Sequence, residues 1–598
     1  MVEWYISTHS TFFIGGIMLE KWFLRNKNNA QSPDKNLNLL ERTKLRILYN
    51  RDITEIDDIR KYFLNPYEAM YDANLFNDFH ILYDRLISLK ENNETVAIVG
   101  DYDVDGIMST TILIKTFKRL GINVTYKIPN RMSDGYGINR RIVDELKLEG
   151  VSLIITVDNG IQAFDVLEYA KDLGLDVFIT DHHELKVEDG EFKIPDSIGA
   201  INPHRPDSNY PFKLLCGAGI AYKVAILLLK KFGVYDEAID RELITLAGIA
   251  TICDVVDLVD ENRIISYHGL LNYRTTTNLG LRAITKVASV DISKVDSYHI
   301  GFIIGPRFNS SGRLKTADLG IELLTTEDED RALEIATELN DLNEERKAYT
   351  ESGYKSALEK IDSNNLPSAL VIYLENIHES VAGIIAGRIK EKYYRPTIVL
   401  TDGEESLKGS GRSVDEFDIY SSISEFSDLC LKFGGHKMAC GLSIEKDRID
   451  EFRDKLIESA NKYETDFIKK VYIDAVFPLE MVDLRFLDML NSFRPFGKAN
   501  EEPKFADNNL KFIGFNVLGK NKNVIKLSLV SSSNRVVTAI LFETEDAFLK
   551  RFKEEFNLDI YDSIQKGLYM DIVYYPQLNE FRGNKEAQII ITNYRYKR

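Results

Sequence analysis

Short apolar runs alternate with longer amphipathic stretches from about residue 95 of the chain. The runs are too short for helices and rich in β-branched residues, so they predict buried strands. These runs are 95–100, 124–128, 151–157 and 177–180. Helical spacing between them predicts helices at 108–120, 139–148 and 164–173. Alternation of this kind indicates a parallel sheet with helices on both faces, where ligands bind at the carboxyl ends of the strands.

The pattern changes three more times along the chain. The pattern of residues 1–80 is typical of helices, and it contains no obvious candidates for catalytic or metal-binding residues. Residues 326–362 are rich in Glu, Asp, Lys, Ala and Leu and contain no Pro, which predicts a long helix that bridges domains. A second α/β region follows, with strands at 369–373 and 397–400. After about residue 465, short alternating segments predict a small β-barrel or sandwich.

Composition narrows the class of protein. A length of 598 residues suggests about four domains. The net charge of −18 excludes a uniformly basic nucleic-acid binder but permits local basic grooves. Four Cys without a C-x-x-C pair exclude a disulfide scaffold and argue against a thiolate zinc site. No apolar run reaches the roughly 18 residues of a membrane span, and no signal peptide is recognised, so a cytoplasmic protein is expected. Met18 is an alternative start of translation.

Acidic and histidine side chains follow several of the predicted strands. Because the carboxyl ends of parallel strands meet at one edge of a sheet, we expect these side chains to converge there. A single Asp after a strand usually caps a helix or lies in a turn, but four such clusters indicate a site. The clusters are Asp101, Asp103 and Asp105 after the first strand, Asp158 after the third, Asp181, His182 and His183 after the fourth, and Asp254 after the apolar stretch 246–252.

Crowded carboxylates are costly unless a cation neutralises them. Oxygen ligands mixed with imidazole suit Mn²⁺ or Mg²⁺ better than Zn²⁺. Two such ions about 4 Å apart activate a water molecule and stabilise the leaving oxygen of a phosphoester. The clusters therefore predict a two-metal site that hydrolyses phosphoesters.

The ordered motifs resemble the DHH phosphoesterase superfamily, and most of all its bacterial single-stranded-DNA exonucleases. An Asp-His-His triplet alone is weak evidence for this family, but the ordered set of motifs is highly specific for it. The resemblance runs from about residue 75 to about residue 505. The motifs are Ile98-Val-Gly-Asp-Tyr-Asp-Val-Asp-Gly106, Pro129-Asn-Arg131, Gly135-Tyr-Gly137, Asp158-Asn-Gly160, Asp181-His-His183, Asn202-Pro-His204, Cys216-Gly-Ala-Gly219, Gly305-Pro-Arg-Phe-Asn-Ser-Ser-Gly-Arg-Leu314, Gly409-Ser-Gly-Arg-Ser413 and Gly434-Gly-His-Lys-Met-Ala-Cys-Gly441.

The resemblance implies a set of metal ligands for two Mn²⁺ or Mg²⁺ ions. Asp158, His182 and His183 are the residues expected at the centre of catalysis, with Asp158 bridging both ions. Asp101 is expected as an additional ligand or as a support for one, whereas Asp257 is interpreted as structural. The implied ligands are Asp103, Asp105, Asp158, His182, His183 and Asp254.

The resemblance also implies contacts to the phosphates of the substrate. Arg131, Ser410 and Arg412 are expected to form a pocket for the 5′-phosphate, which would impose a 5′ to 3′ polarity. His436 would contact phosphate near the metals. A loop rich in Gly and Ser would supply the remaining contacts, with Arg313 as a phosphate clamp. For each residue a plainer interpretation stays open, such as a surface arginine, a solvated turn or a core histidine. The loop residues are Arg307, Asn309 and Arg313.

The C-terminal β-region is locally basic. Lys511, Lys520, Lys522 and Lys526 lie in a stretch without an acid, and aromatic residues are near the basic C-terminus. Basic strands with interleaved aromatics suit single-strand binding by an OB-fold. A solvated β-surface explains these residues equally well, and the resemblance, which includes Arg494-Pro-Phe-Gly497, favours the OB-fold.

The sequence thus predicts an α/β protein with a DHH-type parallel-sheet domain, a long helix, a smaller α/β DHH-associated domain and a C-terminal OB-fold. The expected function is 5′→3′ exonuclease activity on single-stranded DNA, giving mononucleotides, in repair and recombination. Expected partners are a single-strand-binding protein and a helicase, with no membrane and a monomeric state. The predicted ranges are 1–80 (N-terminal region), 81–325, 326–362, 363–465 and 466–598.

Two alternatives remain open. The first is another DHH phosphodiesterase, acting on cyclic dinucleotides or short RNA. Those enzymes resemble the core alone, so the N-terminal region and the C-terminal β-domain count against it. The second is a scaffold that kept the fold and lost catalysis, which the intact set of acidic and histidine residues opposes.

Overall fold

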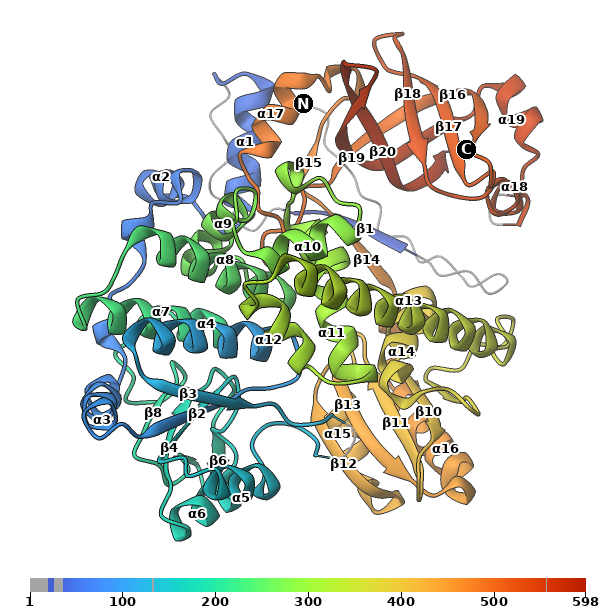
Figure 1. The fold of residues 1–598 in the computed structure, drawn as a ribbon. Helices are drawn as coiled ribbons and strands as arrows, with labels where there is room; N and C mark the ends of the chain where they lie inside the picture. The colour runs from blue at the N-terminus through green and yellow to red at the C-terminus, as the bar shows by residue number, and fades with distance from the viewer. Residues whose placement is uncertain (1–19, 26–35, 132–133, 555–556, 598) are drawn as a thin grey trace. The chain divides into compact units, whose positions relative to one another are not determined.

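The computed structural model describes residues 20–25, 36–131, 134–554 and 557–597 (Figure 1). The expectations about Met18 and a signal peptide lie outside these residues. No helix within the described ranges combines the length and apolarity that a membrane span requires. The chain divides into two compact units, one of residues 53–345 with 492–502 and the other of the remaining residues, and each is described by itself.

The first unit is built on a five-stranded, wholly parallel sheet with strand order β3-β2-β4-β5-β8. The central strands are apolar on both faces and buried, as expected for a sheet covered by helices on two sides. The predicted alternation of strand and helix is confirmed, and the ends of the predicted strands differ from the observed ones by at most two residues. The strands are β2 (Thr95–Val99), β3 (Asn123–Lys127), β4 (Leu153–Val157), β5 (Asp176–Thr180) and β8 (Gly199–Ile201).

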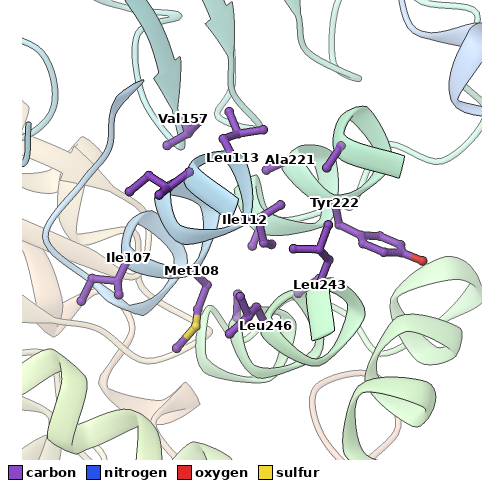
Figure 2. Packing of buried hydrophobic residues seen from close by; sticks show 14 of the residues in the cluster. Ile107, Met108, Ile112, Leu113, Val157, Ala221, Tyr222, Leu243 and Leu246 are labelled. Carbon is purple, nitrogen blue, oxygen red and sulfur yellow. The ribbon is translucent and has the colours of Figure 1, made fainter. Parts of the chain in front are cut away.

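Two groups of helices cover this sheet. Apolar residues of α5 (Arg140–Leu148) and α6 (Phe164–Asp172) form a core with one set of strand side chains. The other core contains α4 (Val104–Leu120), α7 (Gly217–Lys231) and α8 (Glu237–Cys253). Figure 2 shows side chains of these three helices meeting in that second core. Helix α4 begins four residues before its predicted start because Asp103 caps it.

Further helices follow α8 along the chain and lead to the long helix α13. The stretch 305–314 was expected as a loop, and that expectation is wrong, since it forms α11 after the π-helical turn η4. Its serines do not break the helix, because the Ser310 and Ser311 hydroxyls donate to the carbonyls of Pro306 and Phe308. The elements are α9 (Asp260–Tyr273), α10 (Leu279–Val287), η4 (His299–Ile304), α11 (Gly305–Leu314), α12 (Asp318–Thr325) and α13 (Glu329–Glu359).

The other unit contains a five-stranded mixed sheet of order β12-β13-β11-β10-β9. A turn was the plainer interpretation left open for the stretches 409–413 and 434–441, but most of their residues lie in strands. The stretches are rich in glycine, so the sequence alone did not distinguish these strands from loops. The elements are β9 (Leu370–Tyr373), α14 (Glu379–Tyr393), β10 (Thr397–Asp402), β11 (Leu407–Arg412), α15 (Ile419–Ser424), β12 (Cys430–His436), β13 (Ala439–Ile444) and α16 (Ile449–Asn461).

The C-terminal part is a five-stranded barrel, as predicted. Pairing runs β16-β17-β18-β20-β19, and β19 returns to pair with β16, which closes the barrel. The strands and helices are β15 (Ala475–Val476), α17 (Leu484–Asn491), β16 (Phe505–Leu518), β17 (Val524–Val530), β18 (Val536–Leu541), α18 (Glu545–Glu554), α19 (Ile560–Lys566), β19 (Tyr569–Phe581) and β20 (Asn584–Lys597).

The N-terminal region is only partly helical. Helices α1 (Leu39–Tyr49) and α2 (Ile56–Leu64) fit the prediction, but β1 (Glu20–Leu24) does not. It pairs in parallel with β14 (Lys469–Ile473), which lies more than 400 residues further along the chain. A partner that distant leaves no local signal in the sequence.

Candidate metal centre and phosphate contacts

The loop after β2 carries three of the predicted acids. Asp103 is the N-cap of α4, and its Oδ1 accepts hydrogen bonds from the backbone N–H groups of Asp105 (2.9 Å) and Gly106 (3.1 Å). Asp105 lies in the first turn of the same helix and is almost fully buried. Helix capping fixes the direction in which this loop presents its carboxylates.

The N-terminus of α7 holds the Asp105 carboxylate. Its two oxygens accept hydrogen bonds from the N–H groups of Gly217 (2.6 Å) and Ala218 (2.7 Å), where the positive end of the helix dipole favours negative charge. A Cβ atom at Gly217 would lie 2.7 Å from the Cβ of Asp158, so the close approach of these segments requires glycine.

Asp158 follows β4 in a left-handed conformation with φ of 61°. Few residues other than glycine adopt this conformation, although Asp does so more readily than most, and it persists where the surroundings enforce it. The next residue supplies part of that enforcement, because the Asn159 amide donates to the carbonyls of Val99 (3.0 Å) and Val157 (2.9 Å). The Asp158 carboxylate lies 3.0 Å from Nε2 of His182.

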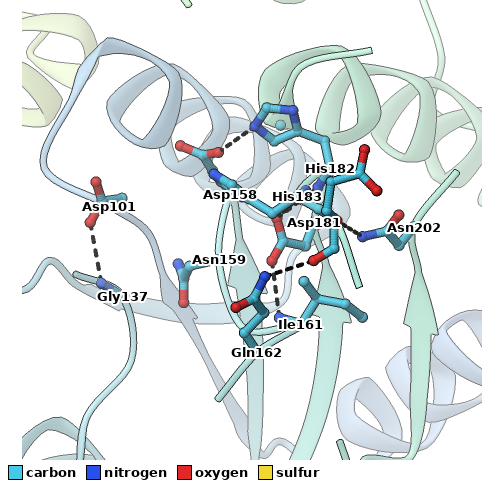
Figure 3. A network of polar contacts seen from close by, with 12 residues as sticks. Asp101, Gly137, Asp158, Asn159, Ile161, Gln162, Asp181, His182, His183 and Asn202 are labelled. Carbon is cyan, nitrogen blue, oxygen red and sulfur yellow. Dashed lines mark hydrogen bonds and ion pairs between the residues drawn. The ribbon is translucent and has the colours of Figure 1, made fainter. Parts of the chain in front are cut away.

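Asp181 positions the two histidines (Figure 3). Its Oδ1 accepts hydrogen bonds from the N–H groups of His182 and His183 and lies 2.7 Å from Nδ1 of His183. Its Oδ2 accepts from the N–H of Ile161 at 3.0 Å. No role was predicted for Asp181 from the sequence, although its place in the triplet was a signal for one.

Asp254 reaches the site from a helix. The apolar stretch before it belongs to α8, and Asp254 is the C-cap of that helix. The expectation that all four clusters lie at one edge of the sheet is therefore wrong for this cluster. The apolar run before Asp254 has a length that fits either a strand or a buried helix, so its helical structure was not recognised. Its Oδ2 is nevertheless 3.9 Å from Nε2 of His182, and Oδ2 of Asp105 is 3.7 Å from the same atom.

Five of the predicted ligands form two overlapping groups that share His182. In each group the potential ligand atoms all lie within 4.8 Å of one another, which is a spacing that a metal ion can bridge. The groups are Asp158, His182 and His183, and Asp105, His182 and Asp254. Overlapping groups with one common member fit a pair of neighbouring ions.

Asp101 and Asp103 lie outside both groups. Asp101 is buried, and its Oδ1 accepts a hydrogen bond from the N–H of Gly137 at 3.3 Å. Its Oδ2 is buried without a hydrogen-bond partner among the described residues. An unsatisfied carboxylate oxygen in the interior is costly, and a cation or its bound water would remove that cost. The ligand roles of both residues remain predictions.

Electrostatics favour a cation in this site. Burial and the neighbouring carboxylates of Asp105 and Asp103 raise the pKa of Asp158 well above its usual range, and the same causes raise the pKa of Asp254 to about 8. Burial, together with Asp103, also raises the pKa of Asp101 to about 8. Carboxylates held this close repel one another until a cation neutralises them. The residues therefore fit divalent metal ions with oxygen and imidazole ligands.

Tyr136 is a further residue of the site that the sequence analysis did not assign. Its hydroxyl donates to the backbone carbonyl of Asp158 at 2.5 Å and lies 3.2 Å from Nε2 of His183. The side chain is half exposed, so one face of the ring is open to solvent beside the metal ligands.

Two of the predicted phosphate-binding arginines lie near one aromatic ring. The Arg131 guanidinium is 4.9 Å from the centre of the Tyr102 ring. Burial raises the pKa of Tyr102, while the positive charges of Arg131 and Arg313 act against that shift. A Cβ atom at Gly312, the residue before Arg313, would lie 2.4 Å from the Tyr102 carbonyl oxygen, so α11 approaches this tyrosine closely. Tyr102 follows Asp101, so this cationic pair adjoins the loop that carries the metal ligands.

Asn309 and Arg307 have partners within the first unit. Asn309 accepts a hydrogen bond from the N–H of Val104 at 3.1 Å, which attaches α11 to the start of α4. Arg307 is buried, and its guanidinium donates to the side chain of Asn340 on α13 and to the carbonyl of Ile303. In this structure Arg307 connects α11 with α13 and with η4, and its contact with DNA remains a prediction.

The other three predicted phosphate contacts lie together on the mixed sheet of the second unit. The Arg412 guanidinium donates to Oγ of Ser410 at 3.1 Å. Arg412 and His436 both pair with Ala439, from either side of β13. A Cβ atom at Gly383 would lie 2.7 Å from the Arg412 guanidinium and 2.8 Å from Ser410 Oγ, so α14 approaches this pair closely.

Comparison with known proteins agrees with this arrangement. The chain matches the DHH family, N-terminal domain, over residues 95–251, the DHHA1 domain over 366–462 and the RecJ OB domain over 473–593. It is 34% identical over 530 residues to the single-stranded-DNA-specific exonuclease RecJ of Bacillus subtilis, covering 87% of this chain and 64% of that protein.

A second relative is matched almost throughout. RecJ of Haemophilus influenzae is 31% identical over 567 residues, which is 91% of this chain and 94% of that protein. The crystal structure of RecJ in complex with Mn²⁺ from Thermus thermophilus superposes with a TM-score of 0.78 at 22% identity, covering 97% of this chain and 80% of that one. The chain therefore belongs to the RecJ family of the DHH phosphoesterases.

Proposed function

We propose that the chain is a metal-dependent exonuclease that degrades single-stranded DNA from its 5′ end and releases mononucleotides. The observation that carries this proposal is the pair of ligand groups that meet at His182, beside strands and helices that hold each side chain in place. Relatives named as single-stranded-DNA-specific exonucleases, matched over most of the chain, support the substrate.

Two Mn²⁺ or Mg²⁺ ions would be held by Asp105, Asp158, Asp254, His182 and His183, with Asp103 and Asp101 as further proposed ligands. When bound, the ions would activate a water molecule and neutralise the charge that develops on the phosphate. Asp181 keeps the His183 imidazole oriented. The N-terminus of α7 holds the Asp105 carboxylate in place through two backbone hydrogen bonds.

Polarity would come from the phosphate contacts. Arg131 and Arg313 present positive charge near the ligand-bearing loop, and Ser410, Arg412 and His436 present donors on the mixed sheet. Arginine suits this task because its guanidinium binds phosphate oxygens through two donors at once. We propose that Arg131, Ser410 and Arg412 bind the 5′-phosphate.

The barrel and its basic strands support binding of the single strand, as in other OB-folds. A monomer that acts with a single-strand-binding protein and a helicase, in repair and recombination in the cytoplasm, completes the proposal.

The test compares a 5′-labelled with a 3′-labelled single-stranded oligonucleotide in Mn²⁺, using the wild type and Asp158→Ala. We expect immediate release of a labelled mononucleotide from the 5′ end by the wild type and loss of that release in the variant. Asp196→Ala, which removes an exposed carboxylate paired with Lys171, is the matched control and should act as the wild type does.

Other outcomes would replace the proposal. Turnover of a cyclic dinucleotide or short RNA, without turnover of DNA, would indicate a different DHH phosphodiesterase. Absence of turnover on every phosphodiester would indicate a scaffold that has lost catalysis.

A further inference from the structure

An exposed pair of aromatic rings lies on the helix that leads to the metal centre. Tyr298 and Phe302 are 60% and 71% exposed, and their rings stack with centroids 5.1 Å apart and an angle of 27° between the planes. Two large rings that stack on each other in solvent gain little burial, so their exposure indicates a surface that receives another flat group.

The backbone around this pair is anchored to the helix that bears Asp254. Tyr298 immediately precedes η4 and Phe302 lies within it, and π-helical turns of this kind recur at functional sites. Ile300, between the two aromatics, is buried, and its carbonyl lies 3.8 Å from Sγ of Cys253, the residue before Asp254. The platform is therefore built on a rigid support next to a proposed metal ligand.

A continuous helical face connects the rings with the metal centre. Phe302, Pro306, Asn309 and Arg313 are spaced by four, three and four residues, so they share one side of η4 and α11. Asn309 contacts the N–H of Val104, between Asp103 and Asp105. At about 1.5 Å per residue, the seven residues from Asn309 to Phe302 span about 10 Å. A DNA strand rises about 3.4 Å per nucleotide, so this distance corresponds to about three nucleotides.

Two arginines lie near the residues that flank the rings, and one of them is paired with a carboxylate. Asp296 accepts from the Arg494 guanidinium at 2.9 Å and lies 2.6 Å from Nδ1 of His299, which follows Tyr298. Arg274 donates to the carbonyl of Val295 at 3.0 Å, three residues before Tyr298. Guanidinium groups beside an aromatic platform suit the alternating bases and phosphates of a single strand.

We propose that Tyr298 and Phe302 form a platform on which bases of the substrate strand stack, about three to five nucleotides on the 3′ side of the phosphate that is cleaved. This inference rests on the proposed exonuclease function. Every base has a π-face, so such a platform binds a single strand irrespective of sequence, and it is unavailable to bases that are paired in a duplex.

The test removes either the rings or the bases. Binding of a labelled, 5′-phosphorylated oligothymidylate of about 20 nucleotides is measured by fluorescence anisotropy in Ca²⁺, and turnover is measured in Mn²⁺. A second oligonucleotide carries abasic sites at nucleotides three to six. We expect the double variant Tyr298→Ala/Phe302→Ala to weaken binding of the normal strand about tenfold or more. The abasic sites should weaken binding to the wild type by a similar factor.

Combining the double variant with the abasic strand distinguishes direct stacking of rings on bases from a general effect of the substitutions on DNA binding. If rings and bases stack on each other, the double variant binds both strands equally, since either change removes the same interaction. The proposal would be wrong if the loss of affinity from the double variant and the loss from the abasic sites multiplied when combined. It would also be wrong if the double variant bound the normal strand as tightly as the wild type does. The conservative variant Tyr298→Phe/Phe302→Tyr should restore binding, and Phe192→Ala, which removes an exposed ring on β7 (Glu191–Lys193), should bind as the wild type does.

Length dependence separates this inference from the proposed function. A trinucleotide is too short to reach the platform, so the loss of kcat/KM in the double variant should be about tenfold larger on the long strand than on the trinucleotide. An equal loss on both would overturn the platform. If the wild type cleaved neither substrate, the exonuclease proposal would fail, while the binding comparison would still decide about the platform.

Discussion

At the scale of single residues, the site depends on side chains that orient the ligands. Asp181 accepts three hydrogen bonds from the two histidines on one oxygen and one from Ile161 on the other. Its pKa lies below the usual range, because the His183 ring and charge outweigh the effect of burial. An ionised Asp181 therefore fixes the ring that must coordinate a metal.

Asp181→Asn tests that role. The amide oxygen retains the shape of the side chain but loses the charge that orients His183, and supports of this kind contribute 10- to 100-fold to metal affinity. We expect Mn²⁺ affinity, measured by isothermal titration calorimetry, to fall by about tenfold or more, with little change in circular dichroism. Asp196→Asn is the control. Unchanged affinity would show that Asp181 is a passive member of the triplet.

At the scale of elements, the sequence predicted the parts whose signal is local. The strands β2, β4 and β5 carry uninterrupted apolar runs, so their carboxyl ends, and with them Asp103, Asp158 and His182, were placed correctly. Asp254 was attributed to a strand end because the apolar stretch before it reads equally as a strand or a buried helix. Strand β1 was missed because its partner β14 is remote in sequence.

Helix α14 supplies a prediction of its own. Gly383→Ala would place a Cβ atom 2.7 Å from the Arg412 guanidinium and 2.8 Å from Ser410 Oγ, and these groups would have to move. If Arg412 binds the 5′-phosphate, the variant should lose about tenfold of its preference for a 5′-phosphorylated over a 5′-hydroxyl strand.

The matched control lies one turn further along the same helix. A Cβ atom at Gly387 meets nothing within 4 Å, so Gly387→Ala should keep the phosphate preference and stabilise the helix by about 0.5–1 kcal/mol. Rates on the two strands, measured by gel electrophoresis, decide the outcome. If both substitutions changed the phosphate preference equally, the result would contradict the proposal that Arg412 binds the 5′-phosphate.

At the scale of the whole molecule, the carboxylates of the metal centre couple folding to pH. The pKa of Asp254 is about 8 in the folded protein, against an ordinary value of 3.8, because of burial and the charges of Asp105 and Asp103. Between these pH values the folded, metal-free protein holds a proton that the unfolded chain has released. Stability therefore falls as the pH rises from about 5 to about 8 in the absence of metal.

Divalent metal should reverse this dependence, since metal binding displaces that proton and grows stronger as the pH rises. We expect the thermal midpoint in EDTA to fall by about 4 °C or more between pH 5.5 and pH 8, and the midpoint in Mn²⁺ to rise over the same range. Differential scanning fluorimetry measures both. Asp254→Asn cannot take up the proton and should flatten both slopes. Parallel slopes with and without Mn²⁺ would show that the clustered carboxylates are not the groups through which metal binding stabilises the fold.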